Sequence, residues 1–203
     1  SHDKARKAMG VNNWKGEISN LMSLNNDTFS RRLTFATCSR AKCLAGEPLY
    51  AVDSATSAVS ADGAAVVMIV SKNVLNSIRP NHYFLCGSMV QVGGGPSLPG
   101  LVPIMAIQKA LSLEGIDSSM LWAIELMEAF AAQAIVCANE TNLNLDKVNI
   151  SGGALARGHP IGASGAILVV RLFHELKRAP FESKGLAAIA AAGGLASALI
   201  LSK

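Results

Sequence analysis

The chain has 203 residues, enough for one large domain or two small ones, and half of them are apolar. A chain of this length can bury most of the surface that its unfolded form exposes, so it needs no disulfide or metal to hold it together. The formal net charge is +4, but the basic residues form no run interleaved with aromatic residues. Nucleic-acid binding is therefore disfavoured, whereas the phosphates of an anionic cofactor would suit the same charge.

The four cysteines are widely spaced and form no CxxC pair. We therefore expect no metal site, and a reducing intracellular compartment rather than secretion. The beginning of the chain lacks the apolar core of a signal peptide. Its last three residues, Leu201-Ser202-Lys203, are not the peroxisomal Ser-Lys-Leu signal.

The first half of the chain is expected to contribute two strands. Residues 1–50 are polar and lack a sustained hydrophobic period, so they are expected to form a segment outside the core. Residues 64–70 are a continuous apolar run, typical of a strand buried on both faces. A turn-rich boundary is expected over 71–81, and a second strand over 83–92. The run Gly93-Gly94-Gly95-Pro96 ends that strand.

Strands and helices alternate in the second half. The pattern predicts helices over 103–113, 128–140 and 163–178, and strands over 120–126, 148–154, 186–191 and 195–201. Such alternation implies a mostly parallel sheet with right-handed crossovers, to which the last two strands add an antiparallel hairpin. Residues 185–202 carry no charge, but Gly193-Gly194 interrupts them, so a hairpin is favoured over a membrane span.

The most informative segment is residues 158–165, with the sequence GHPIGASG. A histidine between glycine and proline cannot lie in an ordinary helix or strand. The small residues after it let a helix begin where another group can approach the backbone. The longer run over 149–165 closely resembles the second signature of the thiolase family, the acyl-CoA enzymes that make or split 3-ketoacyl-CoA thioesters. Residues 62–65, 96–103, 125–131 and 184–194 resemble further thiolase motifs in the same order.

The resemblance implies an α/β, thiolase-like layered fold with a mostly parallel five-stranded sheet and helices on both faces. Residues 1–50 would be a remnant of the thiolase loop region, 51–75 the last strand region of the N-terminal half, and 76–203 the C-terminal domain. The half that carries the nucleophilic cysteine has no counterpart here. Cys38-Ser39 is superficially similar to the nucleophile motif but aligns with the loop region.

The resemblance also assigns the chemistry, and several positions depart from it. His159 stands as in thiolases, where this histidine activates the nucleophile and helps to hold a thioester oxygen; the alternative is that it only packs in its glycine-rich loop. Ala190 takes the place of the cysteine that exchanges a proton with the substrate, and alanine has no ionisable atom. Met127 takes the place of an asparagine that holds a water in the oxyanion hole, and a thioether is at most a weak acceptor.

Coenzyme A or acyl-CoA is the implied ligand, bound non-covalently. The residues expected to contact it are Ser57, Gly158, Pro160 and Ser164. Ala58 lies where the family often has a serine. Arg157 occupies a usually apolar position, where it could meet an anionic ligand, solvent or a partner.

Two functions follow from these substitutions. The favoured hypothesis is a catalytically impaired, non-catalytic subunit of a larger assembly. The alternative is an active acetyl-CoA C-acyltransferase whose nucleophilic cysteine comes from a segment or chain not present here. Both predict a homo-oligomer or a protein partner, possibly one carrying the N-terminal thiolase half. A mitochondrial location is favoured over a cytoplasmic or peroxisomal one.

Overall fold

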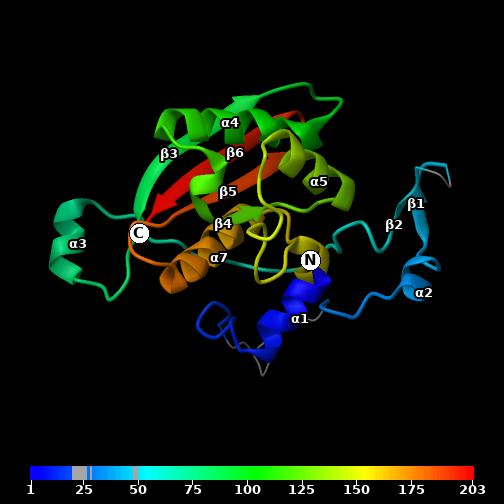
Figure 1. Cartoon of the computed structure of the whole chain (residues 1–203), viewed down its shortest axis with the longest axis horizontal. Helices are drawn as coiled ribbons and strands as arrows, with labels where there is room; N and C mark the ends of the chain where they lie inside the picture. Colours follow the sequence, from blue (N-terminus) through cyan, green and yellow to red (C-terminus); the bar gives the residue numbers. More distant parts are fainter. Residues whose placement is uncertain (20–26, 28, 48–49) are drawn as a thin grey trace.

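The computed structural model describes residues 1–19, 27, 29–47 and 50–203. Within them, a four-stranded sheet runs between helices on its two faces (Figure 1). The spatial order of the strands is β3-β6-β5-β4. Their bounds are Leu85–Gly93 for β3, Leu121–Leu126 for β4, Lys184–Ala191 for β5 and Leu195–Ser202 for β6. The layered α/β fold expected from the sequence is confirmed.

The number and direction of the strands differ from the expectation of a mostly parallel five-stranded sheet. Only β4 and β5 are parallel in this sheet, while β5–β6 and β3–β6 are antiparallel. The strand expected over 148–154 contributes one parallel bridge, between Ile124 and Val148. It stops there because Asn149 and Gly152 adopt positive φ angles, of 48° and 87°, which turn the chain away from the sheet edge.

Two helices cover opposite faces of the sheet because residues on a strand alternate between its faces. Leu186 and Ala188 of β5 pack on the side of α4 (Val102–Glu114), whereas Ala187 packs on the side of α7 (Ser164–Arg178). Helix α4 contacts β3, β6 and β5, while α7 contacts β4 and β5. The sheet is therefore the centre of two apolar cores.

The helices and the hairpin expected in the second half are present. Helices α4 and α7 and the hairpin of β5 and β6 lie within a few residues of their predicted bounds. Helix α5 (Ala131–Glu140) begins three residues later than expected, because Phe130 is extended and pairs with Ser57. Short 3-10 helices occupy Pro99–Leu101 and Ser118–Met120, and α6 spans Ala154–Arg157.

The buried strand expected over residues 64–70 is absent. This segment has no regular secondary structure and pairs with no strand in the part of the chain that the structure describes. Val66 is 89% exposed and Met68 is 79% exposed. A continuous apolar run fits burial on two sides, but no described element covers these side chains. Helix α3 (Lys72–Ile78) follows, where only turns were expected.

The N-terminal region contains more structure than its composition suggested. Helix α1 (His2–Gly10) buries Ala5 and Ala8, which pack with Trp14 and with Ala156 of α6. Further along, α2 (Phe35–Cys38), β1 (Cys43–Ala45) and β2 (Val52–Asp53) form a small projection, seen at the right of Figure 1. None of the helices in the described residues is long and apolar enough to cross a membrane.

Candidate functional site

His159 lies on a loop between α6 and α7 that is fixed by its neighbours. Gly158 has a φ of 91°, which a side chain would strain, and a Cβ there would lie 2.8 Å from the side chain of Ala61. The His159 amide donates a hydrogen bond of 2.8 Å to the Val59 carbonyl. The glycine before the histidine is thus required by a close approach of residues 59–61.

The His159 imidazole is held by Ser164, at the first turn of α7. His159 Nδ1 lies 2.7 Å from Ser164 Oγ, which in turn donates to the Pro160 carbonyl at 2.9 Å. A hydroxyl has one proton to donate, so both bonds form together when Nδ1 carries a hydrogen. The lone pair is then on Nε2, and burial lowers the pKa of His159. The arrangement presents a neutral imidazole that can accept a proton or a hydrogen bond at Nε2.

The residues expected to contact coenzyme A occupy different environments. Ser164 is buried and its hydroxyl bonds within the chain. Gly158 packs under Ala61, whereas Pro160 lines an open hollow. The other residues of this hollow are Ala61, Asp62, Gly63, Ala64, Ala65, Ile161, Gly162, Ala163 and Ala166. Ser57 is buried beside Phe130, and its hydroxyl has no hydrogen-bond partner among the described residues.

Met127 and Ala190 lie on neighbouring chain segments at the same end of the sheet. The Met127 amide donates to the Ala188 carbonyl at 2.9 Å, and Ala190 is two residues further along β5. Met127 is 3% exposed and belongs to the apolar cluster on the α7 side. The Met127 backbone is therefore hydrogen-bonded to the strand that carries Ala190, two residues before that position. Neither side chain offers a group that could take or give a proton.

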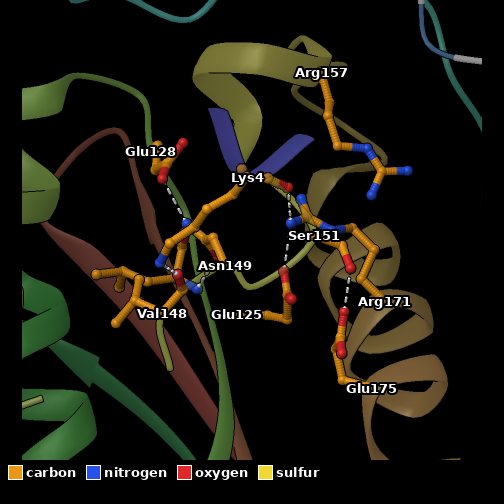
Figure 2. A network of polar contacts seen from close by, with 12 residues as sticks. Lys4, Glu125, Glu128, Val148, Asn149, Ser151, Arg157, Arg171 and Glu175 are labelled. Atoms are coloured by element: carbon orange, nitrogen blue, oxygen red, sulfur yellow. Dashed lines mark hydrogen bonds and ion pairs between the residues drawn. The ribbon is translucent and has the colours of Figure 1, made fainter. Parts of the chain in front are cut away.

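Asn149 joins the end of β4 to the loop before α6, and it was not identified from the sequence. Its side-chain amide pairs with the backbone of Leu126, accepting at 3.0 Å and donating at 2.9 Å (Figure 2). It also donates to Glu128 at 2.7 Å, and Glu128 accepts from the Leu155 amide. Asn149 opens the signature run and Glu128 lies in the 125–131 motif, so motif membership was the available signal.

A second polar group connects β4 to α7 (Figure 2). Arg171 lies 2.7 Å from the Glu125 carboxylate and also donates to the Gly152 carbonyl. Ser151 donates to Glu175 at 2.5 Å. Burial raises the pKa of Glu125 to about 8, although Arg171 acts in the opposite direction. These contacts fix Ser151 and Gly152, in the segment that leads through α6 to His159.

Arg157 faces neither solvent nor an open ligand site. Its side chain is 7% exposed, and NH2 lies 2.6 Å from the Glu17 carboxylate. Nε pairs with Asp27, and the guanidinium carbon lies 4.3 Å from the centre of the Trp14 ring. The interpretation that the sequence left open is resolved in favour of an internal contact. No cluster of potential metal ligands occurs among the described residues.

Comparison with known proteins places this geometry in a family. The model of the C-terminal domain of thiolase matches residues 84–203. The Bacillus subtilis protein YhfS is 36% identical over 204 residues, which cover 98% of this chain and 56% of that protein. The chain thus spans about half the length of such relatives.

Two solved structures share the fold over the whole chain. The acetyl-CoA acetyltransferase of Bacillus anthracis has a TM-score of 0.90 at 28% identity, and the Acat5 thiolase of Ascaris suum, in complex with coenzyme A, has 0.86 at 26%. Each comparison covers 100% of this chain and 53% of the other. The ordered motifs, the domain match and the shared fold show that the chain belongs to the thiolase family and corresponds to its C-terminal portion.

Proposed function

We propose that the chain is a catalytically impaired thiolase subunit that acts within a larger assembly. The observation that carries the proposal is the pair of substitutions at Met127 and Ala190, which lie together at one end of the sheet. A thiolase position that must exchange a proton with the substrate carbon holds a methyl group here. Loss of one group that stabilises an oxyanion typically slows the chemical step by about two to three orders of magnitude. His159 alone cannot replace both groups.

The direct test is thiolysis of acetoacetyl-CoA by free coenzyme A, measured on the protein in its native assembly. We expect no turnover above that of a His159→Ala variant, because the acid at position 190 is missing. The double variant Met127→Asn/Ala190→Cys restores the family residues and is expected to raise any turnover that the assembly supports. Wild-type turnover at the rate of the restored variant would overturn the proposed impairment.

The proposed ligand is coenzyme A or an acyl-CoA, bound beside the His159 loop. The Acat5 thiolase of Ascaris suum is in complex with coenzyme A, which supports this ligand class. Pro160 and Ile161 line the hollow next to His159, and Ile161 is 74% exposed. The unpartnered hydroxyl of Ser57 is a further candidate contact.

Calorimetric titration with coenzyme A tests this ligand. A new carboxylate at the hollow should repel the phosphates, so Ile161→Glu is expected to weaken binding. Phe181→Glu is the matched control, since Phe181 is 80% exposed but does not line the hollow. Equal binding by the two variants would place the ligand elsewhere.

The proposed assembly is motivated by residues 64–70. Most of their apolar side chains are exposed, and their backbone pairs with no strand among the described residues. Exposed apolar segments with unpaired backbone groups tend to be covered by another strand or another chain. The chain also spans about half the length of its relatives. We propose that this segment contacts either a polypeptide equivalent to the N-terminal thiolase half or a second copy of the chain.

Native mass spectrometry, with identification of every co-purifying chain, tests the assembly. Met68→Lys places a charge in the exposed segment and is expected to weaken the association. Met120→Lys is the matched control, because Met120 is also exposed but belongs to the 3-10 helix Ser118–Met120 and not to this segment. A monodisperse wild-type monomer would contradict the proposed assembly.

A second candidate function is an active acetyl-CoA C-acyltransferase built with another segment or chain. The retained His159–Ser164 geometry favours it, since a neutral imidazole with a free Nε2 is suited to activate a thiol. It requires a partner that supplies the nucleophilic cysteine. Turnover in such an assembly that disappears in the His159→Ala variant would establish this candidate over the impaired subunit.

An intracellular location is part of the proposal, with the mitochondrion ahead of the cytoplasm and the peroxisome. The four cysteines are free in the structure, which suits a reducing compartment. Bacterial relatives also fit a cytoplasmic protein. Immunolocalisation of the protein in its own cells distinguishes these compartments.

A further inference from the structure

Arg157 forms a charged cluster directly before the Gly158-His159 loop. Its guanidinium pairs with Glu17 at 2.6 Å and with Asp27, and it stacks over Trp14. The Glu17 side chain is 3% exposed, so this ion pair is nearly dry. A buried pair of this kind is directional, since a guanidinium presents its donors in a fixed planar fork. The cluster therefore fixes the end of α6 in orientation as well as in position.

Two of the partners of Arg157, Trp14 and Glu17, belong to an N-terminal segment, residues 1–18. This segment has several further contacts with the turn before α6. The Ser1 hydroxyl accepts from the Gly153 amide at 2.7 Å, and the Lys4 ammonium donates to the Val148 carbonyl at 2.6 Å (Figure 2). Trp14 is buried and its indole donates to the Ser151 carbonyl at 3.2 Å. The N-terminal segment thus contacts residues 148–157 along most of their length.

A close approach at Gly152 shows how tightly the N-terminal segment packs against the turn before α6. Gly152 has a φ of 87°, and a Cβ added there would lie 2.5 Å from the Cβ of Ala5. Helix α1 therefore lies against the backbone of the turn. A movement of the N-terminal segment would have to move this turn, and the rigid connection continues through α6 to Arg157.

Arg157 is also close to the histidine through the chain. Gly158 follows it and is enclosed by Ala61 and the ring of Phe29, and the Ser30 hydroxyl donates to the Ala156 carbonyl at 3.1 Å. The loop consequently has two supports: residues 59–61 on one side and the Arg157 cluster on the other. The imidazole that bonds to Ser164 is carried by a loop that both supports contact.

We infer that Arg157 is a positioning residue for His159: it holds the His159 loop against Trp14 and Glu17 of the N-terminal segment, with Asp27 as a third partner. The inference does not depend on the proposed function, because it concerns the orientation of the imidazole whether His159 acts as a base or only binds an oxygen. The family resemblance does not predict this role for Arg157, because position 157 is usually apolar in the family. The arginine adds an electrostatic connection to a turn that the shared motif already forms.

Nuclear magnetic resonance of the full chain labelled with 15N-histidine tests the inference. The spectra report both the tautomer and the pKa of His159, and a His159→Ala sample assigns its signals. Wild type is expected to show the tautomer with hydrogen on Nδ1 and a pKa below 6.5, because burial lowers it. An Arg157→Met/Glu17→Met variant removes the buried pair, and apolar replacement of such a pair is often neutral for stability.

In the double variant we expect the His159 pKa to rise toward its ordinary value, together with a mixture of tautomers, as the loop loosens. Arg178→Met is the matched control. Arg178 donates to the Asn13 carbonyl and pairs with Glu175, so it contacts the N-terminal segment without touching the His159 loop. It should leave the His159 signals unchanged.

An unchanged His159 tautomer and pKa in a folded double variant would overturn the inference and leave Arg157 with a structural role alone. If the double variant does not fold, Arg157→Lys decides the question. It keeps the charge but loses the planar fork, so a smaller shift in the same direction is expected. Unchanged His159 signals in Arg157→Lys would then overturn the inference.

Discussion

The two sides of the His159 loop are built in opposite ways. On one side, residues 1–18 and 145–157 are joined by hydrogen bonds and an ion pair that involve Lys4, Trp14 and Arg157. On the other, residues 64–70 are apolar and mostly exposed, and no strand among the described residues pairs with them. The first side is held by contacts within the chain. The second presents the kind of surface that proteins cover in an assembly.

This difference between the two sides explains why the position of the His159 loop is well defined while the surroundings of residues 64–70 are not. Buried polar networks specify a unique arrangement when their members are satisfied, because an unpaired buried group is costly. Apolar side chains in water specify no arrangement by themselves. The orientation of His159 is therefore set within the chain. The surroundings of residues 64–70 depend on what packs against them.

The largest effect is expected from Arg171→Met on the polar side. The change leaves Glu125 buried without its cation and removes the donor to the Gly152 carbonyl. Breaking a buried pair by removing one partner typically costs about 3–5 kcal/mol. Chemical denaturation of the variant above pH 8, where Glu125 is ionised, should show a loss of this size in the free energy of unfolding. Arg178→Met, whose guanidinium is partly exposed, is the control and should cost far less. Equal losses would mean that burial is not the cause.

Gly152→Ala should have the next largest effect. A non-glycine residue at a φ of 87° is strained, and its Cβ would lie 2.5 Å from Ala5. Strain and overpacking each cost about 1–3 kcal/mol, so a total of about 2–4 kcal/mol is expected. Gly162→Ala is the control, because no atom lies within 4 Å of a Cβ at that position. A Gly152→Ala variant as stable as Gly162→Ala would contradict the close fit of α1 on this turn.

Glu125 should make the polar side sensitive to pH. Its folded pKa, about 8, lies above the ordinary value of 4.5, so the folded state binds the proton more tightly than the unfolded state. The contribution of this group to stability is therefore greatest below pH 4.5 and is lost as the pH rises through about 8. One proton gives a slope of at most about 1.4 kcal/mol per pH unit in this window.

Denaturation curves collected between pH 5 and pH 8 measure that slope. Glu125→Gln cannot ionise and should show a flatter dependence on pH than wild type. Parallel curves for the two proteins would mean that Arg171 keeps Glu125 ionised throughout this range.

The smallest effect on stability is expected at the exposed segment. Val66→Lys changes a side chain that is almost fully exposed, and such substitutions usually alter the free energy of unfolding by less than about 0.5 kcal/mol. Thermal unfolding of the isolated chain measures this change. A loss of several kcal/mol in the isolated chain would show that Val66 is packed there, and the contrast between the two sides would disappear.

Parts of the fold could be predicted because local patterns decided them. The bounds of α7 follow from a period that places Leu168, Leu172 and Leu176 on one face, and the turn at Gly193-Gly194 ends β5. The motif around His159 predicted the site loop because glycine and proline restrict the backbone locally. The direction of strand pairing could not be predicted from alternation alone, since β6 lies between β3 and β5 and is antiparallel to both.

The sequence by itself determined the main helices and the final hairpin of the second half, the family, and the identity of the groups at His159, Met127 and Ala190. It did so because these features depend on short stretches of chain or on single residue types. Only the tertiary structure decided that Arg157 is buried in an ion-pair cluster and that residues 64–70 are exposed. Both outcomes depend on which distant segment packs against a residue. The identity of an arginine or a valine does not specify which residues will be its neighbours in space.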